Sequence, residues 1–182
     1  MKHDSLIAKI VRSIFAIYYL AIAITIFVLL NNKEFLENHV YLGLLVLGGS
    51  LPHLLIYFIT GGYKSTSKTC LLVVGIIGFA LGFVFVYSET MTLEEICLYW
   101  GILDIVRGAI EIGDTIPHVA HNKLELLEIG ISIGDIVLGI LLCIHLHHGI
   151  KLHLIYFGIA FILYAVKMII EYAIEKARAK NE

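Results

Sequence analysis

Four ionisable residues lie at helical spacing within one strongly hydrophobic stretch of this chain, residues 99–118. They are Asp104, Arg107, Glu111 and Asp114. At about 100° per residue they fall within an arc of roughly 80°, so they form one stripe along a helix. An unpaired charge at the centre of a bilayer costs about 2.5–3.5 kcal/mol. If this helix crosses a membrane, the stripe must face protein or water rather than lipid.

The next hydrophobic stretch carries a second polar face, made of Glu128, Ser132 and Asp135. These three residues lie within roughly 60° of one another on a helix. Folding the chain at the short turn between the two stretches brings Asp135 to the depth of Arg107 and Glu128 to the depth of Asp114. We therefore predict an ion pair between Arg107 and Asp135.

The charges of this predicted cluster do not balance. Lys167, in the last hydrophobic stretch, could neutralise Glu111 or Asp114, or its long stem could reach toward the cytoplasm. The carboxyl groups are Asp104, Glu111, Asp114, Glu128 and Asp135, and the basic groups are Arg107 and Lys167. Burial and crowding of like charges favour the neutral form of a carboxyl group. At least one of the carboxyl groups is therefore expected to carry a proton near neutral pH, unless a cation or a water-filled cavity relieves the excess.

Three roles fit a cluster of this kind: a static polar clamp between helices, a pathway for protons or cations, and a pocket for a polar substrate. Ionisable residues inside a membrane make a functional role the default hypothesis. Ion pairing alone is nevertheless sufficient for stability. We favour the clamp at this point and keep the other two roles open.

The surrounding sequence predicts an all-α polytopic membrane protein. Hydrophobic residues make up 59% of the chain and charged residues 15%, whereas soluble domains carry about a quarter charged residues. Apolar segments of about 20 residues can each cross a hydrocarbon core roughly 30 Å thick. Six such segments lie at about 10–30, 41–61, 69–88, 96–117, 124–146 and 152–174. We expect residues 1–182 to form a single six-helix transmembrane domain.

Basic residues predict how this domain lies in the membrane. The termini and the second and fourth loops share one side and hold Lys2, Lys9, Arg12, Lys64, Lys68, Lys123, Lys176, Arg178 and Lys180. The opposite side holds only Lys33 and Lys151. Because Lys and Arg are enriched in cytoplasmic loops, both termini are expected to be cytoplasmic in a multi-pass protein of the cell membrane.

An internal repeat organises the apolar segments. The pattern Tyr-X-Gly recurs at residues 41–43, 99–101 and 156–158, each time early in an even-numbered segment. Three two-helix hairpins, at about 10–67, 68–122 and 123–176, account for this spacing. An even number of helices per repeat makes the repeats parallel.

Three stretches of the second half follow one pattern of glycines and aliphatic residues: YWGILDIVRGAIEI, LELLEIGISIGDIVLGILL and YFGIAFILYAVKMIIEYAIEKARAK. In this pattern the chain resembles the HdeD family of small six-helix acid-resistance membrane proteins. The first half shares the resemblance only through the repeat. The chain departs from the usual family pattern by having more acidic groups in its apolar segments. The resemblance implies a role in acid or envelope stress and no particular reaction.

Histidines form a second group of candidate residues. On the outer side, the segment HLHHGIKLH holds His145, His147, His148 and His153. Imidazole groups, with a reference pKa near 6.5, gain charge as the pH falls from 7 to 5. These histidines could form a hydrated rim, a pH sensor or a metal site. Their irregular spacing, without alternating Cys or carboxylate residues, disfavours the metal site.

His53 is a further candidate pH-sensing residue within an apolar segment. It follows Gly49, Ser50 and Pro52, which are expected to break or kink the helix. We interpret His53 as a core residue with one partner, and a proton relay or ligand site is the alternative. The small-residue motif GFALG at residues 78–82 is interpreted as a close helix contact within the bundle, with dimerisation as the alternative.

The sequence contains no nucleophile motif, phosphate-binding loop, zinc signature or dinucleotide fingerprint. We therefore expect a non-enzymatic protein with no cofactor, no metal and no nucleic-acid partner. Its expected partner is the lipid bilayer, and a homo-oligomer is compatible with the sequence. The expected function is acid or envelope stress response, with the cluster as a helix clamp or pH-responsive element. The alternative is a small transporter or channel, either a proton or cation pathway or the substrate-binding component of an importer.

The basic residues make a testable prediction about topology. A reporter fused after Glu182 should lie in the cytoplasm, because basic flanks resist translocation. A tag inserted beside Lys33 should lie on the opposite side of the membrane and serves as the control. Protease added outside intact cells should cleave the tag beside Lys33 and leave the tag after Glu182 intact. Cleavage of both tags, or of neither, would contradict the predicted orientation.

Overall fold

The computed structural model is a helical bundle throughout the part of the chain that it describes, residues 2–32, 34–35, 38–59, 66–88, 92–121, 123–144 and 150–181. Its long helices are α1 (Lys2–Leu29), α3 (His39–Ile59), α4 (Thr66–Tyr87), α5 (Leu93–Thr115), α6 (Lys123–Ile144) and α7 (Ile150–Asn181). A 3₁₀ helix, η2 (Ile116–His121), joins α5 to α6. Each apolar segment predicted from the sequence coincides with one of the long helices, so the all-helical fold class is confirmed.

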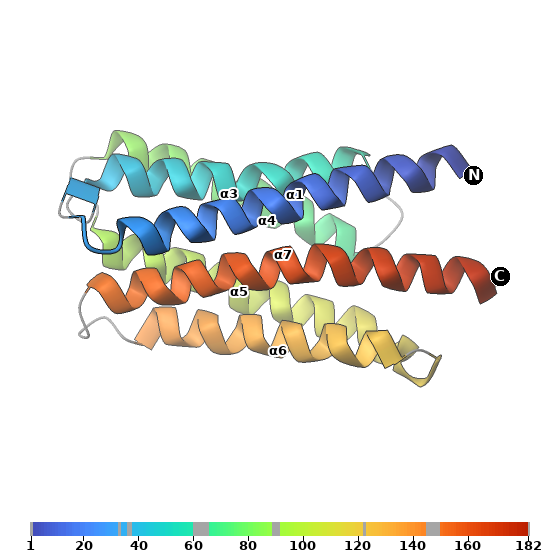
Figure 1. The fold of residues 1–182 in the computed structure, drawn as a ribbon. Helices are drawn as coiled ribbons and strands as arrows, with labels where there is room; N and C mark the ends of the chain where they lie inside the picture. The colour runs from blue at the N-terminus through green and yellow to red at the C-terminus, as the bar shows by residue number, and fades with distance from the viewer. Residues whose placement is uncertain are drawn as a thin grey trace.

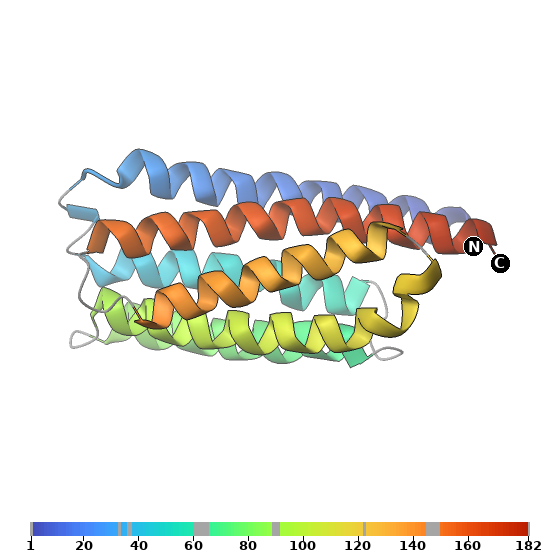
Figure 2. The same cartoon turned by 90° about the horizontal axis from the view of Figure 1, so that it is seen from below.

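The helices run along one another, with the N- and C-termini at the same end of the bundle (Figure 1). The most extensive helix contacts join α3 to α4, α5 to α6 and α1 to α7. The first and last helices therefore lie side by side, and they extend beyond the others at the end that carries the termini (Figure 2). This pairing of α1 with α7 closes the bundle.

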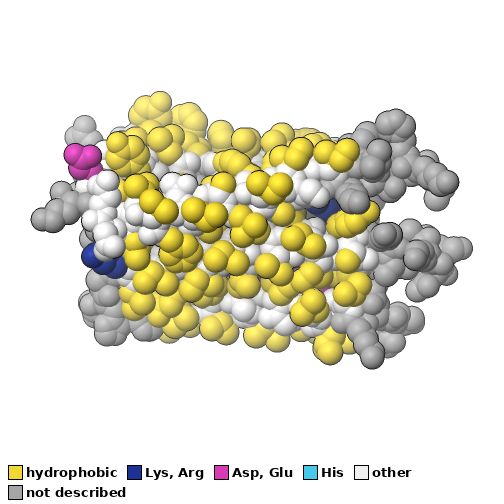
Figure 3. All heavy atoms as spheres, viewed as in Figure 1, with side chains coloured by type: hydrophobic (Ala, Val, Ile, Leu, Met, Phe, Trp, Pro, Cys, Tyr) yellow, Lys and Arg dark blue, Asp and Glu magenta, His cyan; other side chains and the backbone are white. Residues whose placement is uncertain are grey.

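Several helices are long and apolar enough to cross a membrane. Four such spans occur in the described residues, at Ile10–Leu29, Val40–Ile59, Leu124–Ile144 and Lys151–Ile174. Large hydrophobic side chains are exposed along their outer surfaces, and hydrophobic atoms cover the middle of the face in Figure 3 while its charged atoms gather toward the ends. Soluble proteins rarely expose apolar surface of this extent. The helices therefore indicate a membrane protein.

Local contacts define where α5 begins. Thr92 caps the helix: its Oγ1 accepts a hydrogen bond from the Glu95 backbone N–H at 3.3 Å, and the Thr92 N–H donates to Glu95 Oε2 at 2.8 Å. This reciprocal pair satisfies backbone N–H groups that would otherwise lack partners at a helix start. The cap fixes the start of α5, the helix that carries the charged stripe.

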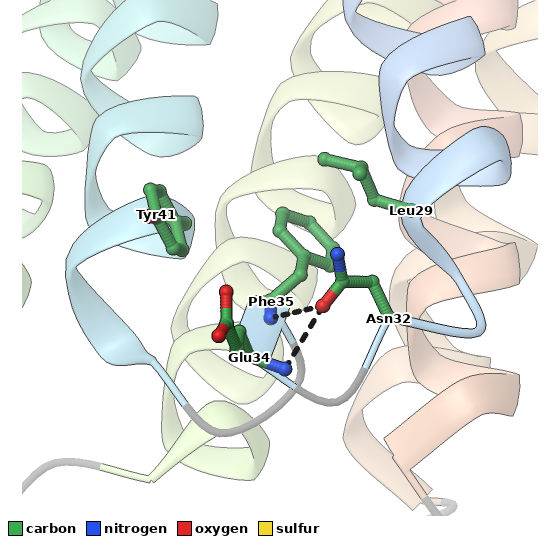
Figure 4. A pocket seen from close by; sticks show the side chains of 5 residues that line it. All are labelled: Leu29, Asn32, Glu34, Phe35 and Tyr41. Atoms are coloured by element: carbon green, nitrogen blue, oxygen red, sulfur yellow. Dashed lines mark hydrogen bonds between the residues drawn. The ribbon is translucent and has the colours of Figure 1, made fainter.

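The turn between α1 and α3 is held by a side-chain amide. Asn32 Oδ1 accepts hydrogen bonds from the backbone N–H groups of Glu34, at 2.9 Å, and Phe35, at 3.4 Å (Figure 4). Leu29 and Tyr41 complete the lining of a pocket at this turn. Asn32 thus caps the described residues 34–35 that follow α1.

Glycines allow two helix pairs to approach backbone to backbone. A Cβ atom added to Gly101 of α5 would lie 2.6 Å from the carbonyl oxygen of Gly139 of α6, and the converse distance is also 2.6 Å. A Cβ atom on Gly82 of α4 would lie 2.7 Å from the backbone nitrogen of Leu47 of α3. Gly78 likewise faces Ser50 of α3. The prediction that GFALG packs within the bundle is therefore confirmed.

These contacts predict a position-dependent effect of adding one methyl group. Gly101→Ala should lower the free energy of unfolding by about 1–3 kcal/mol, because α5 and α6 must move apart to accommodate it. Gly113→Ala is the control, since a Cβ atom there meets nothing within 4 Å. Alanine is the better helix former by roughly 1 kcal/mol, so the control should be neutral or slightly stabilising. Equal destabilisation of both variants in detergent unfolding would contradict the close contact.

A buried charged cluster that joins the helices

The ionisable residues of α5 meet side chains of three other helices in the interior. We call this group the central cluster: His53 of α3; Asp104, Arg107 and Glu111 of α5; Asp135 of α6; and Lys167 of α7. Every member is at most 4% exposed. The predicted stripe therefore faces protein at Asp104, Arg107 and Glu111, which removes the cost of placing these three charges among acyl chains.

Arg107 is the centre of the cluster. Its Nη2 lies 2.6 Å from Asp135 Oδ2, its Nε lies 3.5 Å from Glu111 Oε1, and its Cζ lies 3.7 Å from the centroid of the Tyr164 ring. The predicted ion pair between Arg107 and Asp135 is confirmed. A guanidinium suits this place because it can meet carboxylates along its edge and an aromatic ring on its face.

His53 extends the cluster toward α1. Arg107 Nη1 donates to His53 Nε2 at 3.2 Å. Because a guanidinium can only donate, Nε2 must be the acceptor, so the ring is neutral and carries its proton on Nδ1. Nδ1 lies 3.0 Å from the Tyr19 hydroxyl and 3.1 Å from the Gly49 carbonyl oxygen. His53 is a core residue as expected, but the expectation of one partner is wrong because residues of three helices surround it.

The helix that carries His53 is continuous. The sequence predicted a break or kink around Pro52, and a break is wrong because α3 is helical from His39 to Ile59 with Pro52 inside it. Tyr19 donates to the Gly49 carbonyl oxygen at 3.3 Å, and Ser50 Oγ donates to the Val46 carbonyl at 2.7 Å. These side-chain hydrogen bonds hold the turn of α3 that precedes Pro52.

Lys167 completes the cluster from α7. Its ammonium group forms an ion pair with Glu111 and lies 4.0 Å from Asp135 Oδ2. Glu111 also accepts a hydrogen bond from Ser132 Oγ at 3.1 Å. Of the two acidic partners considered for Lys167, the structure selects Glu111. The side chain points into the bundle rather than toward its end.

Asp104 differs from the other carboxyl groups of the cluster. It accepts a hydrogen bond from the hydroxyl group of Tyr164, and its Oδ2 has no hydrogen-bond partner. Within the described residues, neither Arg107 nor Lys167 forms an ion pair with it. The cluster therefore contains two carboxylates that contact cations and one carboxyl group that contacts a phenol.

The remaining candidates fall outside the cluster. Asp114 and Glu128 are half-buried on α5 and α6, in contrast to the fully enclosed members. His153 is only 1% exposed, so the hydrated-rim reading is wrong for this residue. The other outer histidines, His145, His147 and His148, lie outside the described residues.

Sequence reasoning missed the tyrosines. Tyr19 and Tyr164 are both fully buried, and they contact His53 and Asp104 through their hydroxyl groups. Their signal in the sequence is a tyrosine in the middle of an apolar helix, because buried tyrosine hydroxyls usually need a partner. Arg12 is also buried although the sequence placed it on the cytoplasmic side, and Glu125 is buried at the start of α6.

The geometry limits the chemistry that the cluster can perform. Arg107 stands between His53 and Asp135, and a guanidinium does not release its proton in proteins. A side-chain proton relay along this line is therefore interrupted. In the described part of the chain, no group of three His, Cys, Asp or Glu side chains is arranged to hold a metal ion.

The ion pair predicts strong and coupled effects of mutation. Arg107→Gln and Asp135→Asn should each lower the free energy of unfolding by about 3–5 kcal/mol, because each leaves an uncompensated buried charge. The double variant should lose less than the sum of the two. Asp114→Asn on the same helix is the control and should change stability by under about 1 kcal/mol. Unfolding in mixed micelles measures all four proteins, and additive losses would contradict a direct pair.

Comparisons with known proteins identify no relative. No protein-family model, no characterised protein sequence and no solved structure matches the chain.

Proposed function

We propose that this chain is a non-enzymatic integral membrane protein of acid or envelope stress response, in which the central cluster clamps the helices together. The observation that carries the proposal is the enclosure of the cluster between α3, α5, α6 and α7, with Tyr19 of α1 linked to it through His53. Helices in lipid have little hydrophobic drive to associate with each other. Polar contacts between them therefore matter more for holding one arrangement.

The proposal includes all six helices as membrane spans. α4 has an apolar part of shorter length, Leu72–Tyr87, and α5 is apolar except for its terminal acidic residues and the stripe. Both pack against helices that are long enough to cross. Because the stripe of α5 is enclosed by protein, its charges are no obstacle to a transmembrane position.

Contacts of the repeated glycines support a threefold parallel repeat, and they join helices of neighbouring repeats rather than the two helices of one repeat. Gly43 lies against Val86 of α4, Gly101 against Gly139 of α6, and Gly158 against Phe27 of α1. Each Tyr-X-Gly pattern thus packs an even-numbered span of the sequence against the span that follows, and the last packs against the first. With the basic residues at the ends, this supports a multi-pass arrangement with cytoplasmic termini.

The closed cluster favours a clamp over a transport pathway. A pathway needs polar side chains that water or solute can reach, whereas Asp135 is 0% exposed and Arg107 is 1% exposed. A clamp needs side chains that water cannot reach, because ion pairs are strongest when water is excluded. Carboxylates in such pairs also respond to strong acid, which connects the cluster to the proposed stress role.

Liposome flux and acid survival test the proposal together. Purified protein in liposomes should pass protons, sodium and potassium no faster than empty liposomes, and Arg107→Gln should change thermal stability without changing flux. In cells whose own copy is deleted, the wild-type protein should raise survival of an acid challenge. Arg107→Gln should raise survival less than wild type when both proteins are present in the membrane in equal amounts. If wild type conducts ions and Arg107→Gln abolishes this flux, the protein is a transporter or channel and the clamp proposal is wrong. Survival independent of the protein would contradict the stress role.

A further inference from the structure

Asp104 and Tyr164 form a separate unit within the central cluster. Asp104 is 1% exposed, and Tyr164 is equally enclosed. The phenol hydroxyl contacts one carboxyl oxygen of Asp104, and the other oxygen has no hydrogen-bond partner. Among the described residues, Asp104 is the buried carboxyl group of the cluster that has no cation within ion-pair distance.

Charge balance assigns a proton to this unit. Arg107 and Lys167 already contact the two carboxylates of Asp135 and Glu111, and these charges cancel. An ionised Asp104 would add a third negative charge with no cation of its own. A carboxylate isolated in an apolar interior is so costly that the group is neutralised instead.

The groups around Asp104 do not alter this count. The charged and titratable side chains near it are Arg107 of α5, Asp135 and Cys143 of α6, and Tyr164 and Lys167 of α7. The next groups beyond Tyr164 are His53 of α3 and Tyr19 of α1, whose rings pack against the Tyr164 ring. His53 is neutral because it accepts from Arg107. No uncommitted cation therefore remains for Asp104 among these groups.

We propose that Asp104 and Tyr164 form a proton-binding site, in which Asp104 holds one proton while the bundle is closed and releases it when the helices separate and water enters. This inference deepens the proposed clamp and rests on it. The closed cluster is then electrically neutral, and its opening is coupled to the loss of one proton.

The sign of this coupling follows from the proton count. A hydrated aspartate ionises near pH 3.9, so above about pH 4 the closed bundle binds one more proton than the open bundle. Acidification therefore favours the closed state, by up to about tenfold in the equilibrium constant per pH unit. The stabilisation is complete at the acidic end of this window and is lost as the pH rises. In stronger acid Glu111 and Asp135 also take up protons, and loss of their ion pairs reverses the trend.

Infrared spectroscopy of the full chain in lipid nanodiscs tests the protonation directly. At pH 6 wild type should show the carbonyl stretch of a neutral carboxyl group, and Asp104→Asn should lack this component. Asp114→Asn is the matched control and should retain it. Tyr164→Phe should also retain it, shifted to higher frequency by loss of the phenol hydrogen bond. The same band in Asp104→Asn, or no such band in wild type, would overturn the proposal.

Unfolding across a range of pH tests the coupling. Wild type and Asp114→Asn should lose stability from pH 5 to 7 more steeply than Asp104→Asn does. The difference isolates Asp104, because the histidines are the same in all three proteins. Asparagine imitates the neutral acid in size and can still accept from Tyr164, so this variant is expected to fold. A slope shared by Asp104→Asn and wild type would overturn the proton site. That outcome would leave the clamp intact if Arg107→Gln still destabilises the bundle, whereas a neutral effect of Arg107→Gln would remove the clamp itself.

Discussion

The guanidinium of Arg107 must be neutralised inside an apolar bundle, and the arrangement of its neighbours follows from that constraint. A buried cation is tolerated only when carboxylates and hydrogen-bond acceptors surround it at close range. The ion pair between Arg107 and Asp135 can form only if α5 and α6 pack closely. Glycines lie on both sides of the pair, where the two helices approach each other. Gly101 meets Gly139 on one side of the pair, and a Cβ atom on Gly108 would lie 2.7 Å from the Ser132 carbonyl oxygen on the other. Small residues and the buried charge thus depend on each other.

Stability and proton sensitivity reside in different parts of the central cluster. Arg107, Asp135, Glu111 and Lys167 form mutually compensating ion pairs. Asp104 lies beside these pairs but contacts a phenol, so it can exchange a proton without breaking an ion pair. This separation allows a bundle to be held firmly and still respond to acid. A cluster of ion pairs alone would respond only when acid destroyed it.

The sequence was sufficient for the features that helical periodicity governs. Apolar length predicted the helices, and the spacing of the stripe predicted that its charges share one face. Reversal of the chain between α5 and α6 then determined which residues lie at equal depth, which is why the pair of Arg107 and Asp135 was predictable. The same reasoning narrowed the partners of Lys167 to two carboxyl groups on α5. These inferences need only a helix, its pitch and a short connection.

Contacts between helices that are distant in the chain required the tertiary structure. Depth along a helix says nothing about which non-adjacent helix lies beside it, and here α1 packs against α7. That neighbour relation buries Tyr19 and Tyr164 together and places His53 within reach of Arg107. The sequence by itself determined the helices and the charged face, and the tertiary structure decided which side chains enclose that face, because enclosure depends on the lateral order of helices and not on their periodicity.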